Sequence, residues 1–340
     1  MITSLLLAGW LSLYGAETGR IVVSENGRYL QHADGRPFFW LGDTAWLLFQ
    51  KLNREETERY LENRRVRGFH VIQAVVLSFG PVENAYGAKP FVDGDPARPA
   101  VTEGYDYWDH IDWVVDRAAE KGMYVAIVPA WGSVVKRGVI NEKNAAGYAR
   151  FLAERYRGRP NVFWMNGGDL QGDVQGATWQ ALGRTLRATD PLHLITFHPF
   201  GRTQSSTWFH DAAWLDFNLF QSGHRRYDQD TTAGAKGEDN WRYVFEDWAR
   251  KPAKPTLDGE PSYEEIPQGL HDPKEPRWQD HDVRRYAYWS VFAGACGHTY
   301  GHNAVMQFRK KGTPGSYGSN VTWEEGIEFP GAGQMQHLKT

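Results

Sequence analysis

The chain has 340 residues, of which 41% are hydrophobic and 23% are charged, and its formal net charge is -3. This composition is typical of a soluble globular enzyme, long enough for one large α/β barrel or two smaller domains. Basic residues are scattered among acidic ones, which argues against a nucleic-acid partner. Beyond the N-terminus no stretch approaches the roughly 20 apolar residues of a membrane span, so stable membrane insertion is not expected.

The N-terminal segment from Met1 to Ala16 is apolar and ends in small residues before Glu17. It resembles a secretory signal peptide, although it has no Lys or Arg in its n-region. The alternatives are a miscalled start and an ordinary N-terminal segment. We therefore expect a secreted or periplasmic protein with one enzyme domain over residues 17–340.

Strand-like and helix-like segments alternate along the chain, which is the pattern of a parallel sheet with covering helices. A β-hairpin comes first, with strands at Arg20 to Ser24 and Tyr29 to His32 around Asn26-Gly27. Eight further strands are predicted, the number in a (β/α)8 TIM barrel. They are Phe38 to Gly42, Val71 to Leu77, Tyr124 to Pro129, Val162 to Met165, Leu194 to His198, Phe217 to Gln221, Pro255 to Gly259 and Phe292 to Tyr300.

Helices are predicted between these strands. Asn53 and Glu56 form a capping box for a helix that runs to about Val66, and Gly122 ends a helix over Tyr107 to Lys121. Further helices are predicted at Asn141 to Tyr156, Trp179 to Ala188, Asn240 to Arg250 and His281 to Ser290.

Two long loops, at residues 80–102 and 223–237, are expected to roof the active face of the barrel. The sequence from Pro330 to Thr340 looks like the start of an eighth outer helix that breaks off after about two turns. We therefore expect a chain that is cut short before the end of that helix.

Two carboxylates directly follow predicted strands, Asp169 after the fourth and Glu260 after the seventh. The carboxyl ends of barrel strands carry the chemistry of TIM-barrel enzymes. Paired carboxylates cleave glycosidic bonds, because one protonates the leaving oxygen while the other attacks the anomeric carbon or activates water. The pattern predicts a glycoside hydrolase, with Asp173 as the alternative acid and Glu264 or Glu265 as alternatives to Glu260.

Other polar and aromatic residues follow the strands at the same end of the barrel. Tryptophan, with 15 residues, is suited to stacking on the apolar faces of sugars, although most indole rings are expected in the core. Structural alternatives are helix capping for Asp43, backbone hydrogen bonding for Asn166 and loop packing for Trp131. The substrate-binding candidates are Asp43, Trp46, Trp131, Asn166, His198, Gln221, His224, Tyr263 and His302.

Two adjacent arginines lie in a predicted loop, and the histidines show no metal-ligand pattern. If the substrate carries uronic acids, Arg225 or Arg226 is a candidate partner for a carboxylate, with solvated loop arginines as the alternative. The 12 histidines include no HExxH helix and no tight set of metal ligands. The single cysteine, Cys296, lies in a run of small residues, which is typical of a core thiol. No metal and no cofactor is expected.

Four motifs occur in order along the chain, and together they resemble the apiosidase-like glycoside hydrolase family. They are Gly42-Asp43-Thr44-Ala45-Trp46, Asn166-Gly167-Gly168-Asp169, Asp258-Gly259-Glu260-Pro261 and Pro330-Gly331-Ala332. The resemblance begins at about Arg20. It implies a TIM-barrel hydrolase that acts on apiose linkages of the pectic polysaccharide rhamnogalacturonan II, with an Asp as acid and a Glu as its partner. Those roles transfer to Asp169 and Glu260, because both lie inside matching motifs.

The resemblance also implies a small C-terminal β-sandwich in many members, and we expect this chain to stop before it. The wider clan of retaining barrel glycosidases places a Glu directly after the Asn of strand four, whereas here two glycines and an Asp follow. Strands four and seven nevertheless favour a retaining mechanism. The alternatives are a retaining barrel glycosidase acting on an arabinoside, galactoside or glucan of the plant cell wall, and a non-catalytic carbohydrate-binding barrel. In each case the partner is an oligosaccharide or polysaccharide.

Overall fold

The computed structural model describes residues 19–80, 82–231 and 234–339. The predicted signal peptide, Met1 to Ala16, lies outside these residues. Within the described part of the chain, no helix is long and apolar enough to cross a membrane.

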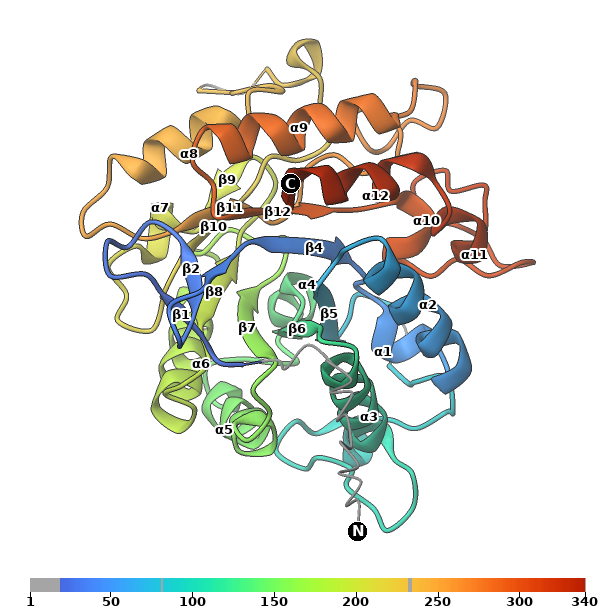
Figure 1. The fold of residues 1–340 in the computed structure, drawn as a ribbon. Coiled ribbons are helices and arrows are strands. Elements are labelled where there is room, and N and C mark those ends of the chain that lie inside the picture. The colour runs from blue at the N-terminus through green and yellow to red at the C-terminus, as the bar shows by residue number, and fades with distance from the viewer. Residues whose placement is uncertain (1–18, 81, 232–233, 340) are drawn as a thin grey trace, which may run out of the picture.

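A ring of eight parallel strands forms the centre of the molecule, and helices surround it (Figure 1). Neighbouring strands pair in the order β8-β7-β6-β5-β4-β12-β11-β10. The ring closes between β8 and β10, where the Asp216 backbone N–H donates to the Ile195 carbonyl at 2.8 Å and the Thr196 hydroxyl donates to the Phe217 carbonyl at 2.8 Å. The predicted (β/α)8 barrel is therefore confirmed. Its strands are β4 (Trp40–Thr44), β5 (Val71–Leu77), β6 (Tyr124–Ala130), β7 (Val162–Gly167), β8 (Ile195–His198), β10 (Asn218–Gln221), β11 (Thr256–Asp258) and β12 (Gly297–Tyr300).

The barrel strands are buried along their whole length. Every residue of β5 and of β6 is buried, because helices cover the outer face of the sheet and side chains fill the interior of the ring. This explains why these segments have nearly continuous apolar sequences rather than an alternating pattern. One short strand outside the ring, β9 (Thr203–Gln204), pairs antiparallel with β10.

The predicted N-terminal hairpin forms as β1 (Ile21–Val23) and β2 (Leu30–His32). A third strand, β3 (Pro37–Phe38), pairs antiparallel with β2. Assigning Phe38 to the first barrel strand was therefore wrong, since the barrel begins at Trp40. The Phe38 ring packs against Tyr124 and Phe163, at the beginnings of β6 and β7, with centroid distances of 5.2 and 6.0 Å. The hairpin thus covers the amino-terminal end of the barrel, opposite the end that carries the candidate residues.

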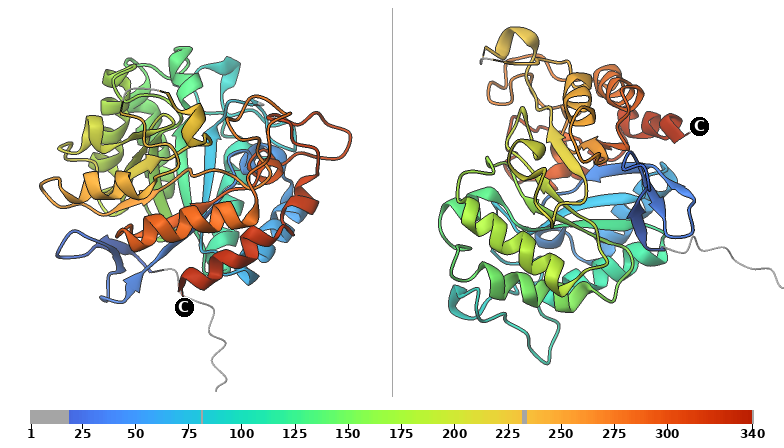
Figure 2. Two further views of the ribbon diagram at one scale, coloured as in Figure 1. Left: turned by 90° about the horizontal axis from the view of Figure 1, so that it is seen from above. Right: turned by 90° about the vertical axis from the view of Figure 1, so that its left-hand side faces the viewer.

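Helices follow the strands in the order expected for a barrel, and two views at right angles show them around the sheet (Figure 2). All six predicted helices form with shifted ends, and the capping box of Asn53 and Glu56 is present. The helices are α1 (Leu48–Lys51), α2 (Arg54–Val66), α3 (Tyr107–Glu120), α4 (Gly132–Lys136), α5 (Ala145–Tyr156), α6 (Gly176–Thr189), α7 (Ser206–Phe209), α8 (Trp241–Trp248), α9 (Asp280–Phe292), α10 (Asn303–Met306), α11 (Trp323–Gly326) and α12 (Pro330–Gln334), with single 3-10 segments at Val92–Gly94, Tyr227–Gln229 and Met335–Lys339.

The last barrel strand was predicted to begin at Phe292, and this boundary was wrong. Phe292 ends α9 with 82% of its surface exposed, and Gly294, at a φ of 110°, turns the chain back towards the barrel. The strand itself begins at Gly297, where a Cβ atom would lie 2.2 Å from the Trp40 carbonyl oxygen. Close pairing of β12 with β4 therefore requires glycine at this position.

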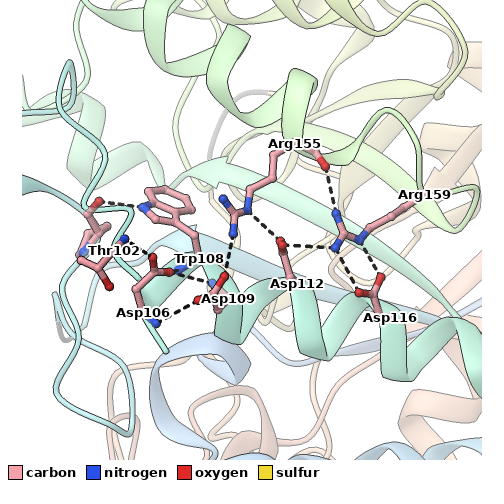
Figure 3. Close-up of polar contacts among 9 residues, drawn as sticks. Thr102, Asp106, Trp108, Asp109, Asp112, Asp116, Arg155 and Arg159 are labelled. Atoms are coloured by element: carbon pink, nitrogen blue, oxygen red, sulfur yellow. Dashed lines mark hydrogen bonds and ion pairs between the residues drawn. The ribbon is translucent and has the colours of Figure 1, made fainter. Parts of the chain in front are cut away.

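Charged side chains join two neighbouring outer helices, α3 and α5 (Figure 3). Arg155 contacts Asp109 at 3.2 Å and Asp112 at 2.9 Å, and Arg159 contacts Asp112 at 3.2 Å and Asp116 at 2.6 Å. We call these five residues the α3–α5 seam. Each of its three aspartates meets an arginine, so the seam is a paired network on the outside of the barrel.

Candidate active site

A cavity of about 480 Å³ opens at the carboxyl ends of the barrel strands. Loops that follow most of the eight strands contribute to its walls, as is usual for the functional end of this fold. The cavity brings together eight residues singled out from the sequence, which are Trp46, Trp131, Asp169, Gln221, His224, Arg225, Glu260 and Tyr263.

The backbone after β7 makes a turn that directs Asp169 into the cavity. Gly167, Gly168 and Asp169 have positive φ angles of 92°, 132° and 52°. A Cβ atom at Gly167 would lie 2.4 Å from the His198 carbonyl oxygen, and one at Gly168 would lie 2.7 Å from the Trp131 ring. The two glycines therefore allow both the left-handed turn and the close approach to neighbouring strands.

Glu260 lies two residues beyond the end of β11, on the floor of the cavity. The end of β11 is fixed by Asp258, whose carboxylate accepts hydrogen bonds from the Ser222 hydroxyl at 2.7 Å and the Asn240 amide at 3.0 Å. Glu260 is 6% exposed. Its Oε2 atom lies 3.0 Å from His198 Nε2, and its Oε1 atom lies 3.3 Å from His224 Nε2. Both carboxylate oxygens therefore face an imidazole nitrogen.

His198 lies beneath the cavity and connects the two carboxylate positions. The Asp169 backbone N–H donates to His198 Nδ1 at 3.4 Å. Nδ1 of the ring therefore faces a backbone donor, and Nε2 faces Glu260. The ring is fully buried between Trp46 and Trp131, with centroid distances of 5.3 and 5.5 Å. The packing fixes the orientation of the imidazole.

The two carboxylates have pKa values displaced in opposite directions. Burial alone would raise the pKa of Glu260, but the contacts and charges of His198 and His224 lower it to about 2. The Asp169 side chain is exposed to the cavity, and the surrounding protein partly desolvates it. This desolvation and the negative charge of Glu260 raise the pKa of Asp169 to about 6. Near neutral pH the site therefore holds one ionised carboxylate beside a carboxyl that accepts and releases a proton, which is the division of roles needed for acid–base chemistry.

An aromatic wall flanks the carboxylates. The Trp46 indole N–H donates to the Tyr263 hydroxyl at 3.1 Å, and the Trp46 and Trp131 rings lie 4.9 Å apart. Phe79 packs against Trp131 at 5.4 Å. Gln221 is 4% exposed, and its Oε1 atom has no hydrogen-bond partner among the described residues. Flat apolar rings beside a buried acceptor suit a polar ligand with apolar faces, such as a sugar.

Besides His198, which lies beneath the cavity, three residues predicted to bind substrate lie outside the cavity lining. Asp43 is fully buried, where it accepts hydrogen bonds from the Tyr60 hydroxyl and, at 2.7 Å, from Arg64 Nε. The Asn166 amide donates to the Trp179 carbonyl at 2.9 Å. His302 caps α10 by accepting from the Ala304 N–H at 3.1 Å. For all three, the structure shows contacts inside the protein in place of the predicted position facing a ligand.

The alternative acids also lie outside the cavity lining. Asp173 is exposed in the loop before α6, and Glu264 accepts hydrogen bonds from the Tyr300 hydroxyl and the Gly331 N–H. Glu265 lies 3.8 Å from Arg277. Of the acids that the sequence left open, Asp169 and Glu260 line the cavity, and Asp173, Glu264 and Glu265 do not.

The two long loops predicted to roof the active face have different positions. The loop from Gly223 supplies Gly223, His224 and Arg225 to the cavity. The described part of the loop at residues 80–102 supplies none, and lies instead against a separate cavity of about 550 Å³. The prediction was therefore right for the second loop and wrong for the first.

Several cavity residues were missed from the sequence. Tyr317 comes from the loop after α10, where its backbone carbonyl accepts a hydrogen bond from the Asn303 amide at 2.9 Å. Burial and the negative charges of Asp169 and Glu260 raise the pKa of the Tyr317 phenol. The one signal in the sequence was Gly-Ser-Tyr-Gly, which marks a tight loop, and in the structure Tyr317 has a positive φ of 52° there. The other missed residues include Phe79, Phe200, Arg202, Leu270, His271 and Met306.

No group of three or more His, Cys, Asp or Glu side chains in the described ranges is arranged to hold a metal ion.

Comparison with protein-family models finds a match to the apiosidase-like catalytic domain over residues 24–340. Comparison with the curated proteins finds no match.

Two solved structures resemble the chain over nearly its whole length. A crystal structure described as a glycoside hydrolase family 5 protein from Bacteroides vulgatus shares 50% identity, with a TM-score of 0.92, and the match covers 96% of this chain and 71% of that one. A structure described as a glycoside hydrolase shares 53% identity, with a TM-score of 0.92, over 95% of this chain and 74% of that one. An endo-1,4-beta-mannanase from Rhizomucor miehei shares 13% identity at a TM-score of 0.58, covering 83% of this chain and 90% of that one, and shows the same barrel fold.

Proposed function

The chain belongs to the apiosidase-like glycoside hydrolase family, and from that premise we propose that it cleaves apiose linkages of rhamnogalacturonan II. Asp169 acts as general acid and base and Glu260 as nucleophile in this proposal. The observation that supports it best is the pair of cavity carboxylates with opposite pKa shifts, to about 6 and about 2. A non-catalytic sugar-binding barrel has no need for such a pair.

Glu260 is suited to attack the anomeric carbon. Its carboxylate is held by His198 and His224 in the ionised form, and its 6% exposure limits the water that would otherwise solvate it. Since the imidazoles contact both oxygens, the carboxylate is oriented before the sugar arrives. Such preorganisation reduces the free-energy cost of reaching the transition state.

Asp169 is suited to protonate the leaving oxygen. Its raised pKa, to about 6, keeps a large fraction of the side chain protonated in mildly acidic solution. When a glycosyl–enzyme bond forms and the negative charge of Glu260 is consumed, the pKa of Asp169 falls because the repulsion that raised it is removed. The ionised Asp169 then activates water for the second step, as a retaining mechanism requires.

Export belongs to the same proposal, because a pectic substrate lies outside the cell that degrades it. The segment from Met1 to Ala16 is the candidate signal. N-terminal sequencing of the mature protein from the periplasm or medium tests this part. A mature chain that still begins at Met1 would contradict it.

The decisive experiment is to incubate the protein with rhamnogalacturonan II oligosaccharides and identify the new reducing end. We expect apiose at that end for the wild type and no release for the matched Glu260→Gln variant. Release of arabinose, galactose or glucose instead would show that the substrate is a different glycoside, and the chain would still be a glycoside hydrolase. If the folded wild type released no sugar from any of these glycosides yet bound them, the carbohydrate-binding alternative would stand.

The stereochemical outcome is a separate measurement. Proton NMR during the first minutes of hydrolysis records the anomeric configuration of the product before mutarotation. We expect the configuration of the substrate to be retained. An inverted first product would leave Asp169 and Glu260 as acid and base and would remove the covalent step.

A further inference from the structure

Two arginines line the catalytic cavity, Arg202 and Arg225, and they differ in their partners. Arg202 Nε lies 3.2 Å from a carboxylate oxygen of Asp230. Arg225 has no carboxylate within ion-pair distance in the described part of the chain, and the hydrogen bond of its guanidinium, to the Gln229 carbonyl, is long at 3.5 Å. Arg225 is partly buried and is one of the residues that line the cavity.

The adjacent residue, Arg226, shows what a structural arginine looks like in this loop. Its guanidinium pairs with Asp228 at 2.9 Å and with Glu275 at 2.7 Å, and it donates to the Gln268 side chain at 2.9 Å. Arg226 therefore joins the loop after β10 to the loop after β11. Arg225 takes no part in that network and is left with an unmatched positive charge.

The backbone that carries Arg225 is held in place next to the proposed nucleophile. The carbonyl of His224 accepts two hydrogen bonds, from the Gly269 N–H at 2.6 Å and from the Trp278 indole at 3.2 Å. The His224 ring contacts Glu260 at 3.3 Å. The backbone of Arg225 therefore directly follows a residue that contacts Glu260 and is held by two hydrogen bonds.

The charge of the cavity also suits an anion at this point. Asp169 and Glu260 are the carboxylates among its lining residues, and both have roles in the proposed reaction. Arginine binds a carboxylate through two parallel N–H donors of a planar fork, which makes it selective for that group. An unmatched guanidinium beside a glycosidic site therefore calls for a substrate that carries a carboxylate close to the scissile bond.

We propose that Arg225 binds the carboxylate of a uronic acid joined to the sugar that the enzyme releases. The proposal rests on the glycosidase function above and adds a substrate requirement to it. The enzyme then distinguishes acidic from neutral oligosaccharides through one side chain, whereas Arg226 maintains the loop.

The test compares one oligosaccharide of rhamnogalacturonan II with the same oligosaccharide after its carboxylates have been reduced to alcohols. The measured quantity is the ratio of kcat/KM for the acidic to the reduced form. We expect this ratio to fall about 10- to 100-fold in Arg225→Gln, mainly through KM, because one charge-assisted bidentate contact is lost. It should keep its wild-type value in Arg226→Gln, the matched control, since damage to the loop affects both substrates alike. An unchanged ratio in Arg225→Gln would overturn the proposal.

A binding measurement separates this proposal from the apiosidase function. Tryptophan fluorescence reports ligands in the cavity because Trp46 and Trp131 line it. A galacturonic acid oligosaccharide should bind the wild type more tightly than its reduced form, and Arg225→Gln should remove the difference. If the wild type cleaves no apiose linkage but shows this discrimination, the proposed function fails and the Arg225 subsite stands. If the wild type binds both forms equally, the subsite is refuted whether or not the enzyme is active.

Discussion

The α3–α5 seam and the catalytic cavity both gather carboxylates, but they hold them differently. In the seam, Asp109, Asp112 and Asp116 each meet an arginine. In the cavity, Glu260 meets two histidines and Asp169 meets the backbone of Gly201. Arginine stays charged at any working pH and would favour the ionised form of every carboxylate beside it. In the cavity the histidines lower the pKa of Glu260, whereas desolvation and the negative charge of Glu260 raise the pKa of Asp169. The two cavity acids therefore take different protonation states, which the arginine-paired aspartates of the seam do not.

Removing the Glu260 carboxylate should have the largest effect on activity. We expect Glu260→Ala to lower kcat at least about a thousandfold, because the nucleophile is absent while the Asp169 acid remains. Added azide should restore part of the rate, since a small anion fits the vacated space and attacks the same carbon. The measurement is initial rate with and without azide, and formation of a glycosyl azide identifies the face of attack.

Glu265→Gln is the matched control for that variant, because Glu265 belongs to the same loop but lies outside the cavity lining. It should keep nearly all activity. Loss of activity in Glu265→Gln together with a fully active Glu260→Ala would reverse the assignment.

Replacing Asp169 should have the next largest effect. We expect Asp169→Asn to lower kcat about 100- to 10,000-fold on natural linkages, which need a proton on the leaving oxygen. Aryl glycosides with acidic leaving groups should lose far less in the first step, because they depart without a proton. Asp173→Asn serves as control and should behave like the wild type on both substrates. Equal losses on the two substrate types would contradict the role of Asp169 as acid.

The pH dependence follows from the direction of the two pKa shifts. The general acid must be protonated, so activity should fall roughly tenfold per pH unit above the pKa of Asp169, which is about 6. Glu260 must be ionised. Because its pKa is about 2, it stays ionised at every pH except in strongly acidic solution. The profile of kcat/KM should therefore show an alkaline limb near pH 6 and no acid limb until strongly acidic solution. An alkaline limb that persists in Asp169→Asn would assign it to another group.

Breaking the seam should have the smallest effect, and on stability alone. Arg159 is 24% exposed and pairs with Asp116, which is 54% exposed, so solvent screens much of their attraction. We expect Arg159→Ala to lower the free energy of unfolding by about 0.5–1 kcal/mol and to leave kcat unchanged. Urea denaturation and initial rates on the same preparation check both statements. A loss of activity larger than the loss of folded protein would show that the two regions are coupled.

Much of the fold could be predicted from local sequence patterns. Buried runs such as Val71 to Leu77 are strands because β-branched residues suit a sheet covered on both faces, and all eight barrel strands were found this way. Errors fell at boundaries, as at Phe292, where an aromatic residue was taken for a strand and instead ends a helix with its ring in solvent. The site was found in part, because carboxylates that follow strands must gather at one end of a parallel barrel.

The sequence by itself determined the strand order, the end of the barrel that holds the candidate site and the two candidate acids on it, since these follow from periodicity and from chain direction. Only the tertiary structure decided which neighbouring residues face the cavity. Asp43 and Trp46 share one motif, yet Asp43 pairs with Arg64 in the core while Trp46 lines the cavity. Arg225 and Arg226 are adjacent and equally charged, yet Glu275, which lies far along the chain, pairs with Arg226 and not with Arg225. Such differences depend on contacts between residues distant in sequence, which no local pattern encodes.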